Sequence, residues 1–402
     1  FQLVPKTERP LLMIPGPTEL PLPVMQALNQ PATIQYDPSF DRGVLEPTTL
    51  GLREVFGTRQ SEVILLPGSG RTGLEASALS LIEPGDRVLV LIAGVFGQLM
   101  REIAERAGAQ VTEFPVEWGQ PIDLPALEKK VLELRPRIIT LVHNETSTGT
   151  TYPADAVGTL ARRVNALFLL DTVSSLGGLD VQSDAWGVDC NMAGSQKCLA
   201  APLGLALVAV GPRAWQAMEK RKRKPHSYAY DLLRWKELWI PVSRGGGVPD
   251  GNPRRQPISI PTHLTQAMNV ATRLILEEGM PARVARHRIA GQAFRAGLDT
   301  LGHDLFPHAN IASDTVSCFK TPNGIESRAV VTRMKEAYGI LITTGLDRFR
   351  ERTLRVGHMG ITASPIFILP TLSALELALR DLGHKGEPGA AVAAAQSIFA
   401  NV

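Results

Sequence analysis

Residues 87–116, RVLVLIAGVFGQLMREIAERAGAQVTEFPV, contain the pattern that decides the fold. The apolar run at 87–92 predicts a buried strand, the amphipathic stretch 96–108 predicts a helix, and 110–116 predicts a second strand. This order is typical of a βαβ unit, in which a crossover helix joins two parallel strands. The fold is therefore expected to be α/β.

The same alternation extends from about residue 45 to 210. Further strands are predicted at 62–67, 137–143, 166–171, 190–195 and 203–211, with helices at 45–56, 71–82, 124–134 and 154–165 between them. Short apolar strands separated by amphipathic helices predict a mostly parallel seven-stranded sheet, flanked by helices and buried on both faces.

The last third of the chain predicts a second, smaller α+β unit. Glycine, proline and charged residues at 243–257 predict a mobile surface loop, and a long helix is expected to start near Thr262. Strands near 314–320 and 353–356 and a closing helix at 367–382 follow. We expect an N-terminal segment (1–20), a large domain (21–265) and a small C-terminal domain (266–402).

Bulk composition excludes several classes of protein. The chain has 402 residues, 44% of them hydrophobic and 20% charged, and a net charge of +3, which is ordinary for a soluble globular protein. The basic run at 220–224 closes a predicted helix (213–221), so we interpret it as a solvated helix end and expect no nucleic-acid partner. No apolar run is long enough for a membrane span, and the first ten residues are too polar for a signal peptide.

Three cysteines without paired spacing indicate an intracellular protein, with the cytoplasm as the default location and no structural metal.

Distinctive residues follow five of the predicted strands. They are Gly68-Ser69-Gly70, Gly94-Val95-Phe96, Asn144-Glu145-Thr146, Asp171 and Lys197. Because ligands of open α/β sheets bind at the carboxyl ends of the strands, we expect these residues to meet at one edge of the sheet.

Lys197 lies among small residues in NMAGSQKCLAAPLG (191–204). An ordinary lysine there can extend its charge to the surface, whereas a desolvated one has a lowered pKa and becomes a nucleophile. GSGRTG (68–73) matches the dinucleotide-binding pattern, so a nicotinamide-dependent oxidoreductase is a serious alternative. However, the next strand runs into Ala93 and Gly94 without the acidic residue that pattern requires. A phosphate site at the start of the following helix is the more general interpretation.

A phosphate site, an acid, an aromatic residue and a lysine are together what pyridoxal 5'-phosphate (PLP) needs, because the lysine forms a Schiff base and the acid keeps the pyridine nitrogen protonated. Each residue also has an ordinary explanation. Asp171 could be a helix cap, Phe96 a core residue and Arg355 half of a surface salt bridge. Thr146 could satisfy turn amides, and Gln196 could bond to backbone.

Nearly the whole chain resembles the class V, fold type I, PLP-dependent aminotransferases of the alanine:glyoxylate and serine:glyoxylate group. The similar stretches are LLMIPGPTELP (11–21), LLPGSGRTGLEA (65–76), HNETSTGT (143–150), LLDTVSSLGG (169–178), GSQKCLAAPLG (194–204) and LRVGHMG (354–360). The resemblance implies a PLP enzyme that moves an amino group from alanine, serine or ureidoglycine to glyoxylate by a ping-pong Schiff-base mechanism. It implies small amino and keto acids as partners, and a homodimer with shared active sites.

The resemblance also implies a role for each matching residue. Lys197 is the Schiff-base lysine, Asp171 the partner of the pyridine nitrogen, and Arg355 the ligand of the substrate carboxylate. Ser69, Gly70, Arg71 and Gln196 hold the phosphate region, Thr146 touches the ring hydroxyl region, Val173 packs beneath the ring, Phe96 stacks on it, and Ser259 reaches the phosphate of the neighbouring subunit.

Gln35 and Gln256 match positions where bacterial ureidoglycine:glyoxylate aminotransferases read the ureido group, with asparagine at the second position. The segment after Arg355 is also similar to pyridoxamine:pyruvate aminotransferase, which is the alternative within the class. A cysteine desulfurase shares the fold but needs a mobile cysteine, and a non-catalytic binding protein would form no chromophore with PLP.

Overall fold

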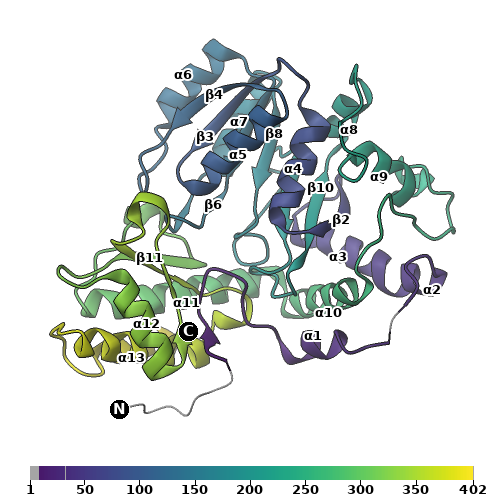
Figure 1. Cartoon of the computed structure of the whole chain (residues 1–402). Helices are drawn as coiled ribbons and strands as arrows, with labels where there is room; N and C mark the ends of the chain where they lie inside the picture. The colour runs from purple at the N-terminus through teal and green to yellow at the C-terminus, as the bar shows by residue number, and fades with distance from the viewer. Residues whose placement is uncertain (1–8, 32, 402) are drawn as a thin grey trace.

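Seven strands form the central sheet of the computed structural model, which describes residues 9–31 and 33–401. In spatial order they are β2 (Glu62–Gly68), β10 (Gly204–Val210), β9 (Cys190–Gly194), β8 (Leu167–Asp171), β5 (Ile138–Val142), β3 (Arg87–Ile92) and β4 (Gln110–Pro115) (Figure 1). β10 is antiparallel to β2 and to β9, and the remaining pairings are parallel. The predicted mostly parallel sheet of seven strands is confirmed, with each strand end within one residue of its expected place.

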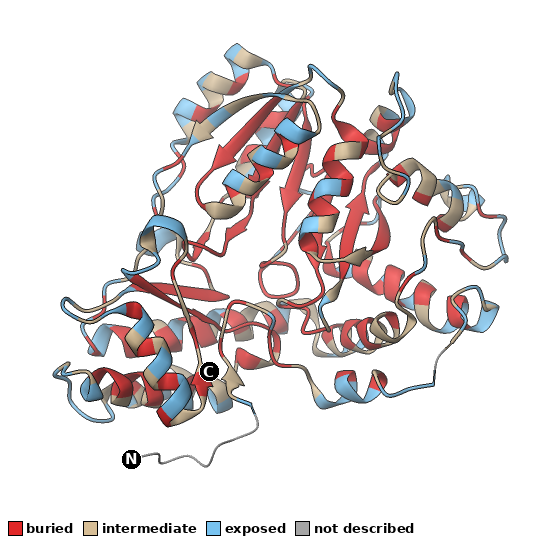
Figure 2. Ribbon diagram, in the orientation of Figure 1, coloured by how far each residue is buried: buried red, intermediate tan, exposed pale blue. Residues whose placement is uncertain are grey.

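Helices cover both faces of this sheet, which explains the continuous apolar runs of its strands. In β3, Val88 and Val90 pack into a core shared with α4 (Gly70–Leu81) and α5 (Val95–Arg106). Leu89 and Leu91 point to the other face, where α6 (Leu124–Leu134) and α7 (Ala154–Arg163) pack. Six of the seven strands are accordingly buried over nearly their whole length (Figure 2), as expected for a parallel sheet covered on two sides, whereas the edge strand β4 is partly exposed.

The C-terminal part has its own sheet and core. β11 (Val316–Lys320), β14 (Thr353–Gly357) and β13 (Thr343–Thr344) form an antiparallel sheet, and α11 (Met280–Thr300), α12 (Ser327–Tyr338), α13 (Pro365–Asp381) and α14 (Ala390–Ala400) pack around a separate apolar cluster. The N-terminal β1 (Leu11–Leu12) pairs with β12 (Ile340–Leu341) and so joins this unit.

The prediction that a helix at 367–382 closes the chain is wrong, because α14 follows it. Residues 390–400, AAVAAAQSIFA, have high helix propensity but lack an amphipathic stripe that would announce a buried helix. α14 instead packs through small residues: a Cβ added to Gly297 of α11 would lie 3.0 Å from the carbonyl oxygen of Ala391.

The expected boundary near residue 265 falls inside a continuous helix, α10 (Thr262–Glu278). The buried residues Ala267, Ala271 and Ile275 of α10 belong to the core beneath the large sheet. We therefore propose Gly279, between α10 and α11, as the boundary between the two units. Residues 1–8 of the expected N-terminal segment lie outside the described residues.

The predicted surface loop at 243–257 is exposed over much of its length, but the prediction does not hold at Arg254 and Gln256, which are buried. The remaining elements are α1 (Leu22–Ala27), α2 (Pro38–Phe40), the π-helical turn η1 (Asp41–Leu45), α3 (Glu46–Val55), the hairpin strands β6 (Asn144–Glu145) and β7 (Thr150–Thr151), α8 (Pro212–Glu219), α9 (Leu232–Trp239), and the 3-10 turns η2 (Val242–Arg244), η3 (Ala309–Ile311), η4 (Asp347–Phe349) and η5 (Gly360–Thr362).

Candidate active site

The carboxyl ends of β2, β3, β5, β8 and β9 lie along one edge of the large sheet, because these strands run in the same direction. We call this edge the rim. The five segments singled out in the sequence follow these strand ends. The fold therefore brings Ser69, Phe96, Thr146, Asp171 and Lys197 to the rim.

Lys197 lies in the connection between β9 and β10, against the N-terminal segment. Its Nζ donates a hydrogen bond to the carbonyl oxygen of Pro15. Gly16 leaves room for the side chain, since an added Cβ there would lie 2.5 Å from Lys197 Cδ. Burial and, to a smaller extent, the positive charge of Arg355 lower the pKa of Lys197 to about 8. An amine with this pKa is a better nucleophile at neutral pH than an ordinary lysine.

Asp171 is the last residue of β8 and is buried, with 3% of its surface exposed. One carboxylate oxygen accepts a hydrogen bond from the backbone N–H of Val173 at 2.8 Å, which is the local capping bond that the ordinary explanation expects. Burial raises the pKa of Asp171 to about 7, and the nearby Glu145 acts in the same direction. A buried acid with a raised pKa, next to a lysine with a lowered one, is a strong indication of a functional site.

The start of α4 presents backbone N–H groups to the rim, with glycines that keep it open. Gly70 lies against Val173, because an added Cβ would lie 2.5 Å from its Cγ2 atom. A Cβ on Gly194 would lie 3.3 Å from the backbone nitrogen of Gly70 and 2.8 Å from Gln196 Oε1. That oxygen is buried without a hydrogen-bond partner in the described part of the chain. A helix N-terminus with an unpartnered amide beside it can hold an anionic group.

Glu145 positions Phe96, a role that the sequence did not reveal. Its buried carboxylate accepts hydrogen bonds from the backbone N–H groups of Phe96 (3.1 Å) and Gly97 (3.2 Å), in the first turn of α5. The Ser147 hydroxyl accepts from the N–H of Val95 at 3.0 Å and donates to Glu145. Burial raises the pKa of Glu145, whereas these donors lower it. The only signal in the sequence was an acid directly after a buried strand.

Arg355 comes from β14 of the small unit and reaches the rim. Its Nε donates to the carbonyl oxygen of Thr344 and its Nη1 to that of Thr146, each at 3.1 Å. It is 7% exposed and makes no ion pair within residues 9–31 and 33–401, so the surface salt bridge is wrong as an explanation of this arginine. The Thr146 hydroxyl donates to Ser174 at 2.8 Å.

Three of the expected site residues belong to two segments outside the five strand ends that form the rim. Gln35, Gln256 and Ser259 belong to segments 33–41 and 254–266, which contact one another: Gln266 Nε2 donates to Thr33 Oγ1 at 3.3 Å, for example. Among the described residues, no hydrogen bond or ion pair joins them to Lys197 or Asp171. Within residues 9–31 and 33–401, the side-chain atoms Gln35 Nε2 and Gln256 Oε1 are buried and have no hydrogen-bond partner.

Residues 42–232 match the family model of the class-V aminotransferases. An aminotransferase of Methanocaldococcus jannaschii, whose name marks it as uncharacterized, is 36% identical over 93% of this chain and 94% of its own length. The chain belongs to the class-V aminotransferases.

Two further members illustrate how complete the similarity is. The (S)-ureidoglycine–glyoxylate transaminase of Bacillus subtilis is 32% identical over 97% of this chain and 95% of its own. The crystal structure of ureidoglycine–glyoxylate aminotransferase from Bacillus subtilis superposes with a TM-score of 0.92, at 33% identity over 98% of this chain and 99% of that one. That of pyridoxamine–pyruvate aminotransferase from Mesorhizobium loti has a TM-score of 0.91, at 29% identity over 99% of both chains.

As a class-V aminotransferase of fold type I, this chain is a transaminase, which rules out the nicotinamide-dependent interpretation of GSGRTG. The desulfurase alternative also lacks its key residue, since Cys190, Cys198 and Cys318 are all buried. None of the helices in the described ranges has the length and apolar character needed to cross a membrane.

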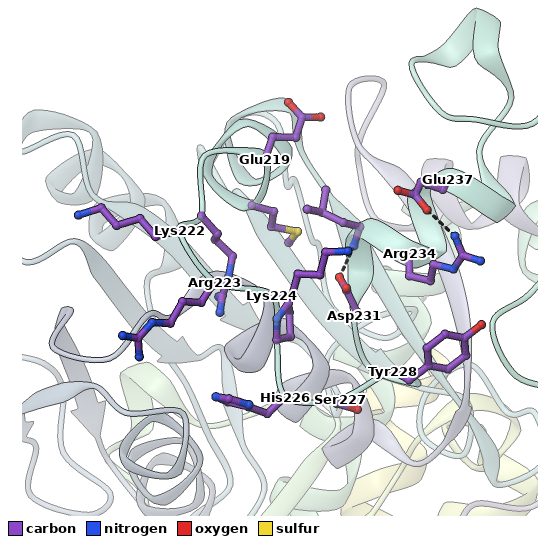
Figure 3. Close-up of a pocket in the computed structure, with 14 residues that line it drawn as sticks. Glu219, Lys222, Arg223, Lys224, His226, Ser227, Tyr228, Asp231, Arg234 and Glu237 are labelled. Carbon is purple, nitrogen blue, oxygen red and sulfur yellow. Dashed lines mark hydrogen bonds and ion pairs between the residues drawn. The ribbon is translucent and has the colours of Figure 1, made fainter.

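A hollow of about 810 Å³ lies at the other end of the large sheet, between the end of α8 and the start of α9 (Figure 3). Arg221 Nη1 donates to the carbonyl oxygen of Ile82, just beyond the end of α4, which starts at the rim. Two acidic side chains that line the hollow form ion pairs: Glu219 pairs with Lys236, and Glu237 pairs with Arg234. The basic residues 222–224 are exposed beyond α8, as a solvated helix end predicts.

Proposed function

We propose that this class-V aminotransferase binds PLP at the rim and moves an amino group from a small amino donor to glyoxylate in two half-reactions. The observation that carries this proposal is the partly buried Lys197 amine, with its lowered pKa, on the same rim as Asp171 and the open start of α4. These groups match the aldehyde, the pyridine nitrogen and the phosphate of the cofactor.

The residues present fit this cofactor. Gly70 and Gly194 keep side chains away from the helix N–H groups, and a Cβ at either would meet the neighbouring atoms. The Gln196 amide has no partner for its oxygen, and rotation of the amide can turn its NH₂ group toward a phosphate. The exposed Arg71 adds a positive charge near the same helix start. Ser69, Gly70, Arg71 and Gln196 are thus the proposed phosphate ligands.

When bound, PLP supplies an aldehyde for the amino group and a ring that accepts the electron pair released at the donor's α-carbon. Lys197 Nζ would bind the aldehyde carbon and, once the donor amine is bound there, would accept the proton from the donor's α-carbon, as a group with a pKa of about 8 can do near neutral pH. Asp171 holds the proton on the pyridine nitrogen. Phe96 and Val173 are proposed to pack on the two faces of the ring, with Thr146 beside it.

Arg355 is proposed to hold the carboxylate of the donor and then of the acceptor. Its Nε and Nη1 are fixed by two backbone carbonyls, which leaves Nη2 to face a ligand without losing the orientation of the plane. A guanidinium fixed in this way fits a carboxylate and orients the reacting C–H bond.

The choice of substrates follows the relatives. The Bacillus subtilis protein is named for ureidoglycine and glyoxylate, and the unpartnered atoms Gln35 Nε2 and Gln256 Oε1 offer a donor and an acceptor for a ureido group. Alanine and serine are the other proposed donors. The alternative is a pyridoxamine–pyruvate reaction, like that in the name of the Mesorhizobium loti protein.

A homodimer with shared sites is part of the proposal. No hydrogen bond between described residues joins Gln35, Gln256 or Ser259 to the Lys197 of their own chain, and we propose that they act at the Lys197 of a second copy. The surface of this aminotransferase also exposes large apolar side chains, as interfaces do: Leu22, Met25, Ile34, Tyr36, Leu203 and Val242.

Absorption spectroscopy tests the cofactor. The protein mixed with PLP should gain a visible band that persists on gel filtration, and the Lys197→Ala variant should lose it. Lys222→Ala, which changes an exposed lysine, is the matched control. A colourless wild-type protein contradicts the proposal.

Single half-reactions identify the donor. The loaded enzyme is mixed separately with alanine, serine, ureidoglycine and pyridoxamine, and the loss of the visible band is timed. Gln35→Ala should slow the half-reaction with ureidoglycine more than the half-reactions with the other three donors. Equal losses with all donors would count against a ureido-reading role.

Mixing two inactive variants tests the shared site. Lys197→Ala and Ser259→Trp should each be inactive as homodimers, whereas a mixed dimer has one intact site if Ser259 acts across the interface. Recovery of about a quarter of the activity supports the proposal, since half the dimers formed at random are mixed and each has one of two sites. No recovery in confirmed mixed dimers argues against it.

A further inference from the structure

The connection that presents Lys197 contains a strained turn. Ala200 has a φ of 51°, in the left-handed region that a residue with a Cβ rarely adopts. The turn is closed by a hydrogen bond of 2.9 Å from the N–H of Ala200 to the carbonyl oxygen of Lys197. Such a conformation persists only where its surroundings hold it in place.

Arg283, in the first turn of α11, contacts this turn directly. Its Nη2 donates to the carbonyl oxygen of Cys198, the residue after Lys197, at 2.7 Å. Its Nε donates to the carbonyl oxygen of Gly177, in the loop that follows Asp171, also at 2.7 Å. Its Nη1 pairs with Glu278 at 2.6 Å, and only 5% of the residue is exposed.

Arg283 thus joins the turn that follows Lys197 to the loop that follows Asp171. The two loops touch each other closely as well, because an added Cβ on Gly178 would lie 2.6 Å from the Cys198 sulfur atom. The planar guanidinium suits this place, since it donates to two carbonyls and a carboxylate in fixed directions.

We propose that Arg283 is a positioning residue for Lys197, which holds the strained turn 197–200 in register with the loop after Asp171. The proposal rests on the proposed function, and it assigns to α11 a part in the reaction although Arg283 touches neither substrate nor cofactor.

Arg286 provides a matched control, because it lies one turn further along α11 and pairs with the same glutamate. Its Nε donates to Glu278 at 2.6 Å, and its Nη1 donates to the carbonyl oxygens of Gly360 and Ala363, each at 2.8 Å. It makes no hydrogen bond to the turn 197–200 among the described residues. Loss of Arg286 therefore removes a similar set of bonds without releasing the lysine.

The first readout is steady-state kinetics of the loaded enzyme. Arg283→Gln should lower kcat about 10²-fold, the effect of misplacing a reacting group by about 1 Å, with a donor KM within about threefold of wild type. Arg286→Gln should stay within about threefold of wild type in both. Equal effects of the two substitutions would overturn the proposal.

The second readout is the pH dependence of Lys197 labelling by cyanate in protein without PLP, followed by mass spectrometry. Arg283→Gln should move the apparent pKa of Lys197 from about 8 toward the ordinary value of 10.5, because the released turn exposes the amine. Arg286→Gln should leave it in place. An unchanged value in Arg283→Gln would refute positioning, even if the proposed substrates prove wrong.

Guanidinium rescue covers the case in which Arg283→Gln folds poorly. A hollow of about 270 Å³, lined in part by Leu199, Ala200 and Glu278, leads to Arg283 from the surface. Millimolar guanidinium should raise the activity of Arg283→Ala at least about tenfold. It should leave the activity of Arg286→Ala unchanged. Absence of rescue in a folded Arg283→Ala protein contradicts the proposal. A wild type that is itself inactive with PLP would instead count against the proposed function.

Discussion

Replacing Lys197 by methionine should stabilise the protein without PLP at pH 7. Burial lowers the pKa of Lys197 from 10.5 to about 8. At about 1.4 kcal/mol per unit of pKa, the folded chain disfavours the ammonium form by about 3 kcal/mol. Methionine has a similar length and no charge, and it loses the bond to Pro15, worth about 1 kcal/mol. The expected net gain is about 2 kcal/mol.

The sign of the pH dependence follows from the lowered pKa. Below pH 8, Lys197 is charged in both the folded and the unfolded chain, so the free-energy cost of burying its ammonium group is fully present. Above pH 10.5 it is neutral in both, and the cost is gone. The difference in the free energy of unfolding between Lys197→Met and wild type should therefore shrink as the pH rises from 8 to 10.5.

Urea midpoints of the two proteins, measured without PLP at pH 7 and pH 10.5, check this expectation. Lys222→Met is the control, because Lys222 is exposed and its replacement should not change the difference between the two pH values. A Lys197→Met protein that is less stable than wild type at pH 7 would refute the reasoning. So would an advantage of equal size at both pH values.

Substitutions at three further residues test the other groups at the rim. Asp171→Asn should lower kcat about 10²-fold while the fold, measured by circular dichroism, is retained, because the pyridine nitrogen loses its charged partner. Arg355→Lys should lower kcat/KM for the amino donor about 10- to 10²-fold in steady-state assays, since a lysine cannot reproduce the planar fork; an unchanged value would exclude Arg355 as the carboxylate ligand. Glu145→Ala should destabilise the protein by about 2–4 kcal/mol in urea unfolding, because backbone donors at Phe96 and Gly97 are left buried and unpaired, whereas Glu145→Gln should cost less.

Local patterns predicted the sheet well, because every strand of the large unit except the edge strand β4 is buried on both faces and has a mostly apolar sequence. The alternation of strands and helices also predicted the common rim, since parallel strands end at the same edge. By contrast, the runs of alanine in α14 carry no amphipathic pattern, so its packing on α11 had no local signature. The antiparallel direction of β10 likewise follows from its short connection to β9, not from its composition.

For the proposed site, the sequence singled out residues that the fold brings to the rim, but it did not single out the residues that hold them in place. Asp171 and Lys197 are conspicuous because a charged residue is unusual at a buried strand end. Arg283 is not, because it sits in a basic helix among ordinary arginines and acts on a turn more than 80 residues earlier in the chain. The role of Glu145 depends in the same way on α5, which starts nearly 50 residues before it. Such long-range contacts become visible only in three dimensions.

The antiparallel course of β10 has a consequence for how this scaffold can diversify. The connection 195–203 leaves β9 and re-enters the same sheet through β10, so hydrogen-bonded ladders fix both of its ends. An inserted or deleted residue would have to shift one ladder by a whole register or alter the turn that carries the lysine. Insertions are tolerated far better in exposed connections such as 220–231, at the opposite end of the sheet. Changes of loop length should therefore accumulate in other connections of the chain and spare the nine residues 195–203.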